Sequence, residues 1–387
     1  MFRRLIILLA AIMSFTAVHA QDDSSHLRIS LLTCGVGEEL YSSFGHTGVR
    51  IIDSSRGMDI VYNYGTFNFG DPDFYSKFVR GKLLYYVSKD VFEGFMDEYV
   101  YEHRKVEEQV LLLNGEQKRK IDSFLEWNAL PAHRDYKYDF LFDNCATRIR
   151  DIGPNILGPG FKFGRTLPEN SKMTFRNIID QYLARKHWER FGIDIALGSR
   201  IDKVMSNSDV MFLPDYLRDG LAGATLNGQK VAGETKVILP GGDDHSSGGL
   251  NQPFLLTCLI AILTIAGLTV EKLKILGKVM SFVLMLVTGL LGCFLIFMWL
   301  GTDHQACQNN LNVLWALPTN IIFVFSRKNK DRYALVAILL LIVSLLLHIL
   351  HIQELPLLEL MPLLLALLFV YGMVLRRSKA KRLNGNQ

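Results

Sequence analysis

The segment Tyr138-Asp139-Phe140-Leu141-Phe142-Asp143-Asn144-Cys145-Ala146-Thr147-Arg148 places a cysteine after an aromatic run, at the predicted start of a helix. Free backbone N–H groups and the positive end of the helix dipole stabilise a thiolate at such a position. Arg148 and Arg150 add positive charge nearby. We therefore interpret Cys145 as a candidate nucleophile, with a buried inert cysteine as the alternative. The helix is expected to end by Gly153-Pro154, because proline cannot continue it.

A second polar segment, Ser42-Ser43-Phe44-Gly45-His46-Thr47-Gly48-Val49-Arg50, places a histidine at the opening of a predicted strand. Small neighbours leave the ring of His46 accessible, so that it can act as a general base; an ordinary surface or core histidine is the alternative. The neighbouring segment Tyr62-Asn63-Tyr64-Gly65-Thr66 offers Asn63 or a tyrosine hydroxyl to orient the ring. Spacing alone leaves both open, and ordinary strand packing is the alternative for the two tyrosines.

Apolar residues alternate along residues 27–33, 46–52 and 60–67, which predicts a small antiparallel sheet. Helical patterns lie between the strand-like segments, so the first part of the chain is expected to be an α+β domain. The other predicted elements are a helix capped by Ser88 and running to about His103, a strand over 106–113, a helix through Leu130 opened by a capping box of Asn114 and Gln117, a helix over 177–189 and a strand over 236–239.

The first twenty residues have the order of a secretory signal peptide: Arg3 and Arg4, an apolar run over residues 5–17, and then Val18-His19-Ala20. We predict cleavage after Ala20. A retained membrane helix is the alternative, although the run is short for a full span. With either interpretation the next part of the chain is exported, and we expect a periplasmic domain over residues 21–240.

The last third of the chain carries most of the apolar residues. A linker over residues 241–252, rich in Gly, Asp and Ser, leads into this part. Most of the apolar stretches are long enough to cross a bilayer of about 30 Å, whereas the third is short and contains Pro318. We predict a five-helix transmembrane domain over 253–377 and a basic cytoplasmic tail over 378–387. The five stretches cover residues 253–270, 279–300, 311–325, 333–351 and 355–375.

Clusters of basic residues follow the first, third and fifth stretches, and such clusters face the cytoplasm. This orientation puts the N-terminal domain outside, in agreement with the predicted signal peptide, and indicates a multi-pass protein of the bacterial inner membrane. The loop over residues 301–307 then lies on the outer face, where Asp303 and His304 can bind a headgroup or move a proton; a simple polar turn is the alternative. His348 and Glu359 fall within predicted spans and are weaker functional candidates.

Composition excludes several other classes of function. The chain has 42 basic and 38 acidic residues, and this near balance argues against nucleic-acid binding. No His/Cys/Asp spacing resembles a metal site and no glycine-rich phosphate loop is present, so we expect neither a metal nor another cofactor. Two of the five cysteines lie within apolar stretches, and the remaining Cys34, Cys145 and Cys307 do not form a disulfide framework.

The segments Gly45-His46-Thr47 and Asp143-Asn144-Cys145-Ala146-Thr147-Arg148, with histidine before cysteine, resemble permuted papain-like thiol enzymes of the NlpC and lecithin:retinol acyltransferase kind. More closely, the whole chain resembles the Lnb-type bacterial lipoprotein N-acyltransferases. This resemblance covers the soluble domain and the membrane part. It rests on Leu32-Thr33-Cys34, Glu39-Leu40-Tyr41-Ser42, Tyr62-Asn63-Tyr64-Gly65-Thr66-Phe67, Phe212-Leu213-Pro214 and Thr302-Asp303-His304.

The resemblance implies an α+β papain-like, permuted NlpC-like periplasmic domain followed by an all-α transmembrane helix bundle. It implies transfer of an acyl chain from a phospholipid to the N-terminal amino group of a diacylglyceryl lipoprotein, with Cys145 as nucleophile and His46 as base. We further expect Asn63 to act with them, and we expect substrate contacts from Asn144, Arg148, Tyr64, Asp303 and His304. The alternatives are a membrane-anchored cysteine peptidase or cell-wall amidase, and a non-catalytic envelope assembly protein.

Overall fold

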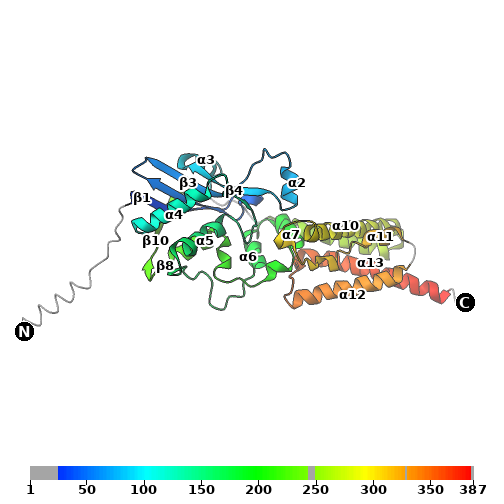
Figure 1. The fold of residues 1–387 in the computed structure, drawn as a ribbon. Helices are drawn as coiled ribbons and strands as arrows, with labels where there is room; N and C mark the ends of the chain where they lie inside the picture. The colour runs from blue at the N-terminus through cyan, green and yellow to red at the C-terminus, as the bar shows by residue number, and fades with distance from the viewer. Residues whose placement is uncertain (1–24, 243–248, 327–328, 385–387) are drawn as a thin grey trace, which may run out of the picture.

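The computed structural model describes residues 25–242, 249–326 and 329–384. The predicted signal peptide over residues 1–20 and its cleavage site lie outside the described residues, as does the middle of the predicted linker. Figure 1 shows an N-terminal α/β domain at one end of an elongated bundle of helices. The two-part organisation expected from the sequence is therefore present.

Within the described residues, seven strands form one antiparallel sheet, as the apolar alternation predicts. Its strand order is β10-β5-β1-β2-β3-β4-β6. The strands are β1 (Leu27–Cys34), β2 (His46–Asp53), β3 (Met58–Thr66), β4 (Leu84–Val91), β5 (Val106–Leu111), β6 (Asp135–Lys137) and β10 (Ala232–Leu239). A small second sheet contains β7 (Phe161–Lys162), β8 (Thr225–Leu226) and β9 (Gln229–Lys230).

Helices pack on both faces of the large sheet. The larger core holds side chains of β1 and β2 such as Ile29 and Ile51, packed against helix residues such as Leu125, Ile149 and Leu217. A smaller cluster on the other face surrounds Phe95 and Tyr99. The helices of this domain are α2 (Phe74–Val79), α3 (Phe92–Tyr101), α4 (Gly115–Asn128), α5 (Cys145–Leu157), α6 (Phe175–Tyr182), α7 (His187–Ala196) and α8 (Pro214–Ala222).

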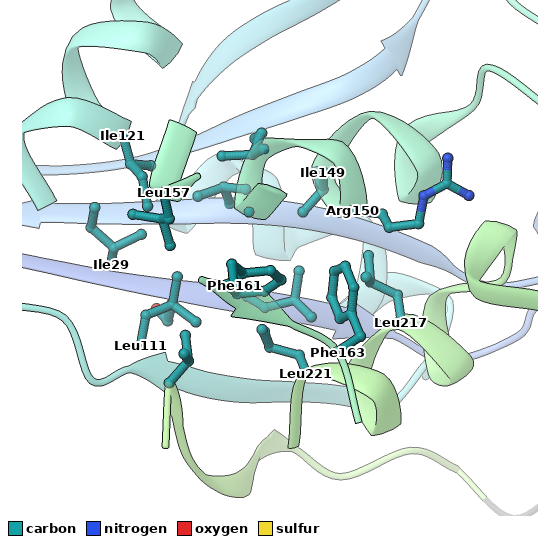
Figure 2. Close-up of a pocket in the computed structure, with 16 residues that line it drawn as sticks. Ile29, Leu111, Ile121, Ile149, Arg150, Leu157, Phe161, Phe163, Leu217 and Leu221 are labelled. Atoms are coloured by element: carbon teal, nitrogen blue, oxygen red, sulfur yellow. The ribbon is translucent and has the colours of Figure 1, made fainter. Parts of the chain in front are cut away.

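An apolar cavity of about 50 Å³ lies in the larger core, lined by residues such as Ile29, Phe161 and Leu221 (Figure 2). Helix α5 lines it from Ile149 to Leu157. The apolar side chains that line the cavity belong to the larger core of the domain.

Three predicted helix boundaries are wrong. Ser88 lies inside β4, where it is paired with Asn63 of β3, and helix α3 begins only at Phe92. The aromatic and β-branched run before Ser88 favours a strand and outweighs the local capping signal. Helix α5 continues past Pro154 to Leu157, because a proline near the end of a helix removes only one backbone hydrogen bond.

The third wrong boundary concerns the helix predicted over 177–189, which is divided into α6 and α7. Thr174 caps α6 through a capping box with Asn177, so this helix begins before the predicted start and ends at Tyr182. By contrast, the capping box of Asn114 and Gln117 is confirmed at the start of α4.

Within the described residues, four helices are long and apolar enough to cross a membrane. They are α9 (Gln252–Thr269), α10 (Lys274–Leu300), α12 (Lys330–Ile349) and α13 (Leu357–Asn384). The third predicted stretch forms instead a short 3-10 helix, η6 (Leu311–Leu314), and the six-residue α11 (Asn320–Phe325), separated by Pro318. A fifth crossing at this stretch stays a prediction.

Buried polar side chains support this broken third stretch. The side chain of Asn320 receives hydrogen bonds from the hydroxyl groups of Tyr333 and Tyr371 and donates one to Thr288. Glycine makes the close approach of α10 possible, since a Cβ on Gly292 would lie 2.0 Å from the carbonyl oxygen of Ala316. The segment is thus packed inside the bundle, where irregular backbone is tolerated.

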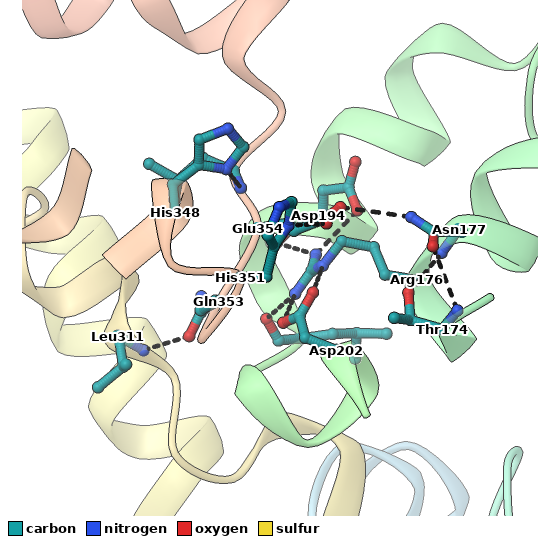
Figure 3. A network of polar contacts seen from close by, with 12 residues as sticks. Thr174, Arg176, Asn177, Asp194, Asp202, Leu311, His348, His351, Gln353 and Glu354 are labelled. Carbon is teal, nitrogen blue, oxygen red and sulfur yellow. Dashed lines mark hydrogen bonds and ion pairs between the residues drawn. The ribbon is translucent and has the colours of Figure 1, made fainter. Parts of the chain in front are cut away.

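A network of buried charges in the α/β domain lies beside the loop between α12 and α13 (Figure 3). The guanidinium group of Arg176 on α6 donates hydrogen bonds to Asp202 at 2.7 Å and to Asp194 at 2.9 Å. The next residue, Asn177, donates to Glu354 in the loop between α12 and α13. Breaking a buried pair of this kind leaves an uncompensated charge, which costs about 3–5 kcal/mol. The hydrogen bond from Asn177 to Glu354 links this network to the bundle.

Further contacts extend this junction to residues predicted inside the spans. Glu359 at the start of α13 is buried and pairs with Arg190 of α7 and with Asn251. His348 near the end of α12 accepts a hydrogen bond from the backbone N–H of Leu355. Both residues have structural partners close to the α/β domain, and these contacts account for their presence at the ends of apolar helices.

Candidate active site

Cys145 is the first residue of α5, and its position is fixed by the residue before it. Asn144 caps the helix: its side chain accepts a hydrogen bond from the backbone N–H of Thr147, and the Thr147 hydroxyl accepts one from the Asn144 backbone N–H. The Asn144 amide also donates to the carbonyl oxygens of Phe140 and Phe212, at 2.8 and 2.9 Å. All polar atoms of this side chain are therefore engaged in holding Cys145 at the helix start.

His46 is the first residue of β2, at the end of the sheet that lies nearest Cys145. Its half-buried ring and the Cys145 side chain meet at Gly65 of β3. A Cβ built on Gly65 would lie 3.8 Å from the Cβ of Cys145 and 4.0 Å from the Cε1 of His46. The φ of Gly65 is +95°, a conformation that favours glycine. The cysteine and the histidine, 99 residues apart in the chain, are thus neighbours in space.

Asn63 is hydrogen-bonded to His46, with 2.7 Å between Asn63 Oδ1 and His46 Nε2. The other end of its amide donates to the Asp90 carboxylate at 3.1 Å. Asp90 also accepts a hydrogen bond from the Ser88 hydroxyl, which in turn lies 3.0 Å from the Thr66 hydroxyl. Because a carboxylate only accepts, the Asn63 amide must present its oxygen to His46. This places the proton on Nε2 and leaves Nδ1 free to take a proton from the thiol.

Asp90 and Ser88 were missed as site residues, because the sequence pattern places this segment in a helix. Both lie on β4, next to Asn63 of β3, with which Ser88 is in register. The signal was present in the sequence, because residues two apart on a strand share a face. In a strand, Ser88 and Asp90 point the same way and can serve the same neighbour.

The charge of each partner shifts the pKa of the other. Burial alone would raise the pKa of the Cys145 thiol, but the positive charge of His46 and hydrogen bonds from it and from the backbone of Thr47 and Ala146 lower it below its ordinary value of 9.0. Burial alone would lower the pKa of His46, but the thiolate and the Asn63 hydrogen bond raise it above 6.5. Both shifts favour the charged forms of the pair, thiolate and imidazolium.

The other cysteines of this domain and of the outer loop have the opposite tendency. Burial raises the pKa of Cys34 to about 12 and that of Cys307 to about 11. Cys34, Cys145 and Cys307 are all described by the structure, and all are free thiols. The shift toward the reactive thiolate is thus found at Cys145, in the setting that the sequence singles out.

The remaining predicted residues of the α/β domain surround the pair without forming a common surface with it. Tyr64 is buried and donates its hydroxyl proton to Asn128 at 2.7 Å, so its polar end points into the core. Arg148 binds Asp143 through two nitrogens and stacks on the ring of Tyr136, 3.8 Å from its centroid. Arg148 thus braces the first turn of α5. A substrate contact by Tyr64, Asn144 or Arg148 stays a prediction.

Asp303 and His304 bring the loop after α10 against the α/β domain. The Asp303 carboxylate pairs with Lys137 at 2.9 Å, and its backbone N–H donates to Arg80. The His304 Nε2 lies 3.1 Å from the carbonyl oxygen of Phe78. These contacts place the loop beside α2 and β6. Its predicted part in substrate binding stays untested.

The described residues contain no group of three or more His, Cys, Asp or Glu side chains arranged to hold a metal ion. The chemistry that the site offers is that of a thiolate, an imidazole and backbone N–H groups. Such a set attacks an acyl carbon and holds the developing oxyanion.

Fold and site together define a membrane protein whose α/β domain carries a cysteine–histidine pair close to its membrane helices. Residues 14–181 match the model of the Lnb N-terminal periplasmic domain, and residues 244–382 match the model of the Lnb transmembrane domain. The chain belongs to the family of Lnb-type lipoprotein N-acyltransferases. It is accordingly a lipoprotein-processing membrane protein whose N-terminal domain is periplasmic. No curated protein and no solved structure matches the chain.

Proposed function

We propose that this protein transfers an acyl chain from a phospholipid to the N-terminal amino group of a diacylglyceryl lipoprotein, through a thioester on Cys145. The observation that carries the proposal is the meeting of the Cys145 and His46 side chains at Gly65, with the imidazole held by Asn63 and Asp90. Membership of the Lnb family supports the substrate classes.

In the first half of the reaction, the Cys145 thiolate attacks the carbonyl carbon of a phospholipid ester. The C–S bond forms, the carbonyl oxygen becomes an oxyanion, and the C–O bond to the glycerol oxygen then breaks. The imidazolium of His46 donates its proton to that leaving oxygen, so a lysophospholipid departs as a neutral alcohol. The backbone N–H groups of Thr47 and Ala146, which bond the sulfur, are donors available to the oxyanion.

In the second half, the unprotonated amino group of the lipoprotein attacks the thioester carbonyl. His46, now neutral, takes the proton that the nitrogen loses as the C–N bond forms. The C–S bond breaks and the sulfur leaves as a thiolate, a better leaving group than an alkoxide. The products are an amide and the original thiolate–imidazolium pair, so the cycle needs no cofactor.

The membrane bundle favours transfer between lipids over hydrolysis of a soluble peptide. Both substrates of the proposed reaction are anchored in a bilayer, whereas a single span would suffice to tether a peptidase. The described chain has four helices able to cross a membrane, and the ion pair of Arg190 with Glu359 joins α13 to the α/β domain. We therefore favour transfer over the peptidase or amidase alternative.

The test is mass spectrometry of lipoprotein N-termini in a strain that depends on this gene. Cells with Cys145→Ala or His46→Ala copies are expected to accumulate lipoproteins with a free N-terminal amine, while the wild type carries the added acyl chain. Cys307→Ala is the matched control, because it removes a buried thiol outside the site. Intact-mass measurement of the purified full chain with phospholipid should add one acyl group to the wild type and none to Cys145→Ala.

Acylated N-termini in the Cys145→Ala strain, at an expression level equal to that of the wild type, would overturn the proposal. Peptide hydrolysis that depends on Cys145, without any change in lipoprotein N-termini, would support the peptidase alternative. A wild-type phenotype in both variants would support a non-catalytic assembly role.

A further inference from the structure

An exposed aromatic surface surrounds helix α2. We call it the α2 surface and define it by five residues with large exposed apolar side chains: Phe69, Tyr75, Phe78, Val79 and Leu84. Tyr75 is 81% exposed, Phe69 75% and Phe78 50%. Contiguous apolar surface of this kind marks a place of contact with a partner or a membrane.

Ring contacts make this surface a single unit. The ring of Phe69 lies 4.6 Å from that of Phe67 and 5.0 Å from that of Phe74, measured between centroids. Phe74 in turn stacks on Phe78 at 6.2 Å. The exposed rings are therefore presented by a packed cluster of aromatic side chains.

The position of the α2 surface relative to the bundle indicates what it touches. Helix α10 ends at Leu300, and the loop after it binds the end of α2 directly: His304 Nε2 contacts the carbonyl oxygens of Phe78 and Val79. Asp303 donates its backbone N–H to Arg80. Figure 1 shows α2 on the side of the sheet that faces the bundle. The exposed rings are thus tied to the chain within a few residues of the end of a membrane-length helix.

Basic residues at the edge of the α2 surface are also consistent with a position next to the membrane. Lys77, Arg80 and Lys82 lie on α2 or directly after it. Lys77 is paired with Asp71, whereas the side chains of Arg80 and Lys82 are exposed. Aromatic rings and basic side chains are the residues found where a protein meets lipid headgroups.

The aromatic surface also leads toward the nucleophile. Phe67 contacts Tyr85 with 5.2 Å between ring centroids, and Tyr85 stacks on Tyr138 at 4.4 Å. The ring of Tyr138 and the side chain of Cys145 both lie 3.8 Å from the position of a Cβ on Gly65. Aromatic rings therefore run without interruption from the exposed α2 surface to the immediate surroundings of the sulfur.

We propose that the α2 surface enters the outer leaflet of the membrane and binds the acyl chains of phospholipids there. Delivery of one such chain along the rings to Cys145 rests on the proposed function, whereas the lipid contact itself does not. The occupant is the bilayer, because the contacts to Asp303 and His304 hold the surface at the outer end of the bundle.

Photo-crosslinking tests the contact in the full chain. The Cys145→Ala protein, reconstituted in vesicles of phosphatidylethanolamine and phosphatidylglycerol, would carry p-benzoylphenylalanine in place of Tyr75. Leu112 is the matched control position, because it is an exposed apolar residue just beyond β5 at the end of the sheet opposite His46. Mass spectrometry should find several-fold more phospholipid adduct at position 75 than at position 112.

Equal adduct at the two positions, or a crosslink from position 75 to a second copy of the chain in place of lipid, would overturn the proposal. Because Cys145→Ala has no nucleophile, this outcome is independent of the proposed acyl transfer.

A second measurement concerns delivery. Tyr75→Ser together with Phe78→Ser is expected to raise KM for a donor embedded in vesicles several-fold and to leave kcat with a water-soluble short-chain ester unchanged. An equal effect on the two donors would overturn the delivery step.

Discussion

The Nε2 of His46 lies 2.7 Å from the Oδ1 of Asn63, and the Nδ2 of Asn63 lies 3.1 Å from the Oδ2 of Asp90. This chain of bonds fixes the orientation of the imidazole from β3, the strand next to its own, and from β4 beyond it. Three neighbouring strands, β2, β3 and β4, each contribute one residue to it. The sheet therefore acts as the frame that presents the histidine to the start of α5.

Asn63→Ala is expected to lower kcat by roughly a factor of 10², toward the lower end of the effect of losing a general base. The base is retained but is no longer held in one tautomer.

Asp90→Ala should lower kcat less and shift the acidic limb of the pH–rate profile, because Asp90 acts through Asn63. The measurement is acyl transfer in vesicles across pH 5 to 9. An Asp90→Ala enzyme with an unaltered profile would exclude this positioning role.

The pH dependence of thiol alkylation should identify Cys145 as the reactive cysteine. Its pKa is lowered, so the thiolate forms below pH 9 and reaction with iodoacetamide should persist as the pH falls. Cys34, with a pKa raised to about 12, should stay unlabelled in the folded protein. His46→Ala removes the positive partner and should move the midpoint for Cys145 to higher pH. Peptide mass spectrometry of the labelled chain measures this, and an unchanged midpoint would contradict the proposed pair.

A comparison of Gly65→Ala with Gly57→Ala should show whether a loss of activity comes from backbone strain or from the added side chain at position 65. Gly65 and Gly57 both have positive φ, +95° and +62°, so alanine at either position should cost about 1 kcal/mol of stability. Gly57 faces open space in the turn between β2 and β3, whereas a side chain at Gly65 points between Cys145 and His46. Only Gly65→Ala should therefore lower activity. Equal activity of the two variants would argue against substrate approach past Gly65.

Asp180→Asn should flatten the pH dependence of stability. Burial, and then the charge of Asp194, raise the pKa of Asp180 to about 7 from an ordinary value of 3.8. The folded state therefore binds a proton more tightly than the unfolded state, and this contribution to stability is lost as the pH rises through about 7. The variant should gain stability relative to the wild type at pH 8 and have a smaller difference between pH 5 and pH 8.

Thermal unfolding of the full chain in detergent would measure this difference. Asp219→Asn, which removes an exposed carboxylate of the same domain, is the control. A wild-type slope in Asp180→Asn would show that the carboxylate titrates near its ordinary value.

The sequence was sufficient to predict the strands β1, β2 and β3 and the pairing of Cys145 with His46, because polar residues at element starts leave a local signal. Asp90 was missed for a physical reason: Ser88 resembles a helix cap in isolation, and only its pairing with Asn63 across the sheet favours the strand. Tyr64 resembles a site residue for the opposite reason. It adjoins Asn63 in sequence, but successive strand residues point to opposite faces.

The membrane part was predictable where apolar length alone determines the structure. The stretch around Pro318 is different. Its short helices depend on the buried Asn320 and on close packing against the glycines of α10, and both are contacts between segments that sequence patterns do not show. Similarly, the partners of Arg176 include Asp194 and Asp202, which lie 18 and 26 residues further along the chain and are brought to it by the fold.

The ion pair of Arg190 with Glu359 and that of Lys137 with Asp303 connect the α/β domain to the bundle at two separate points. While both contacts are made, the α/β domain keeps one orientation and the sulfur stays at one height above the bilayer. In each turnover it is then the lipid substrate that must move along the membrane normal to reach the sulfur. An acyl chain has to leave its leaflet to reach the enzyme. The energy barrier for this movement depends on the composition of the membrane as well as on the protein.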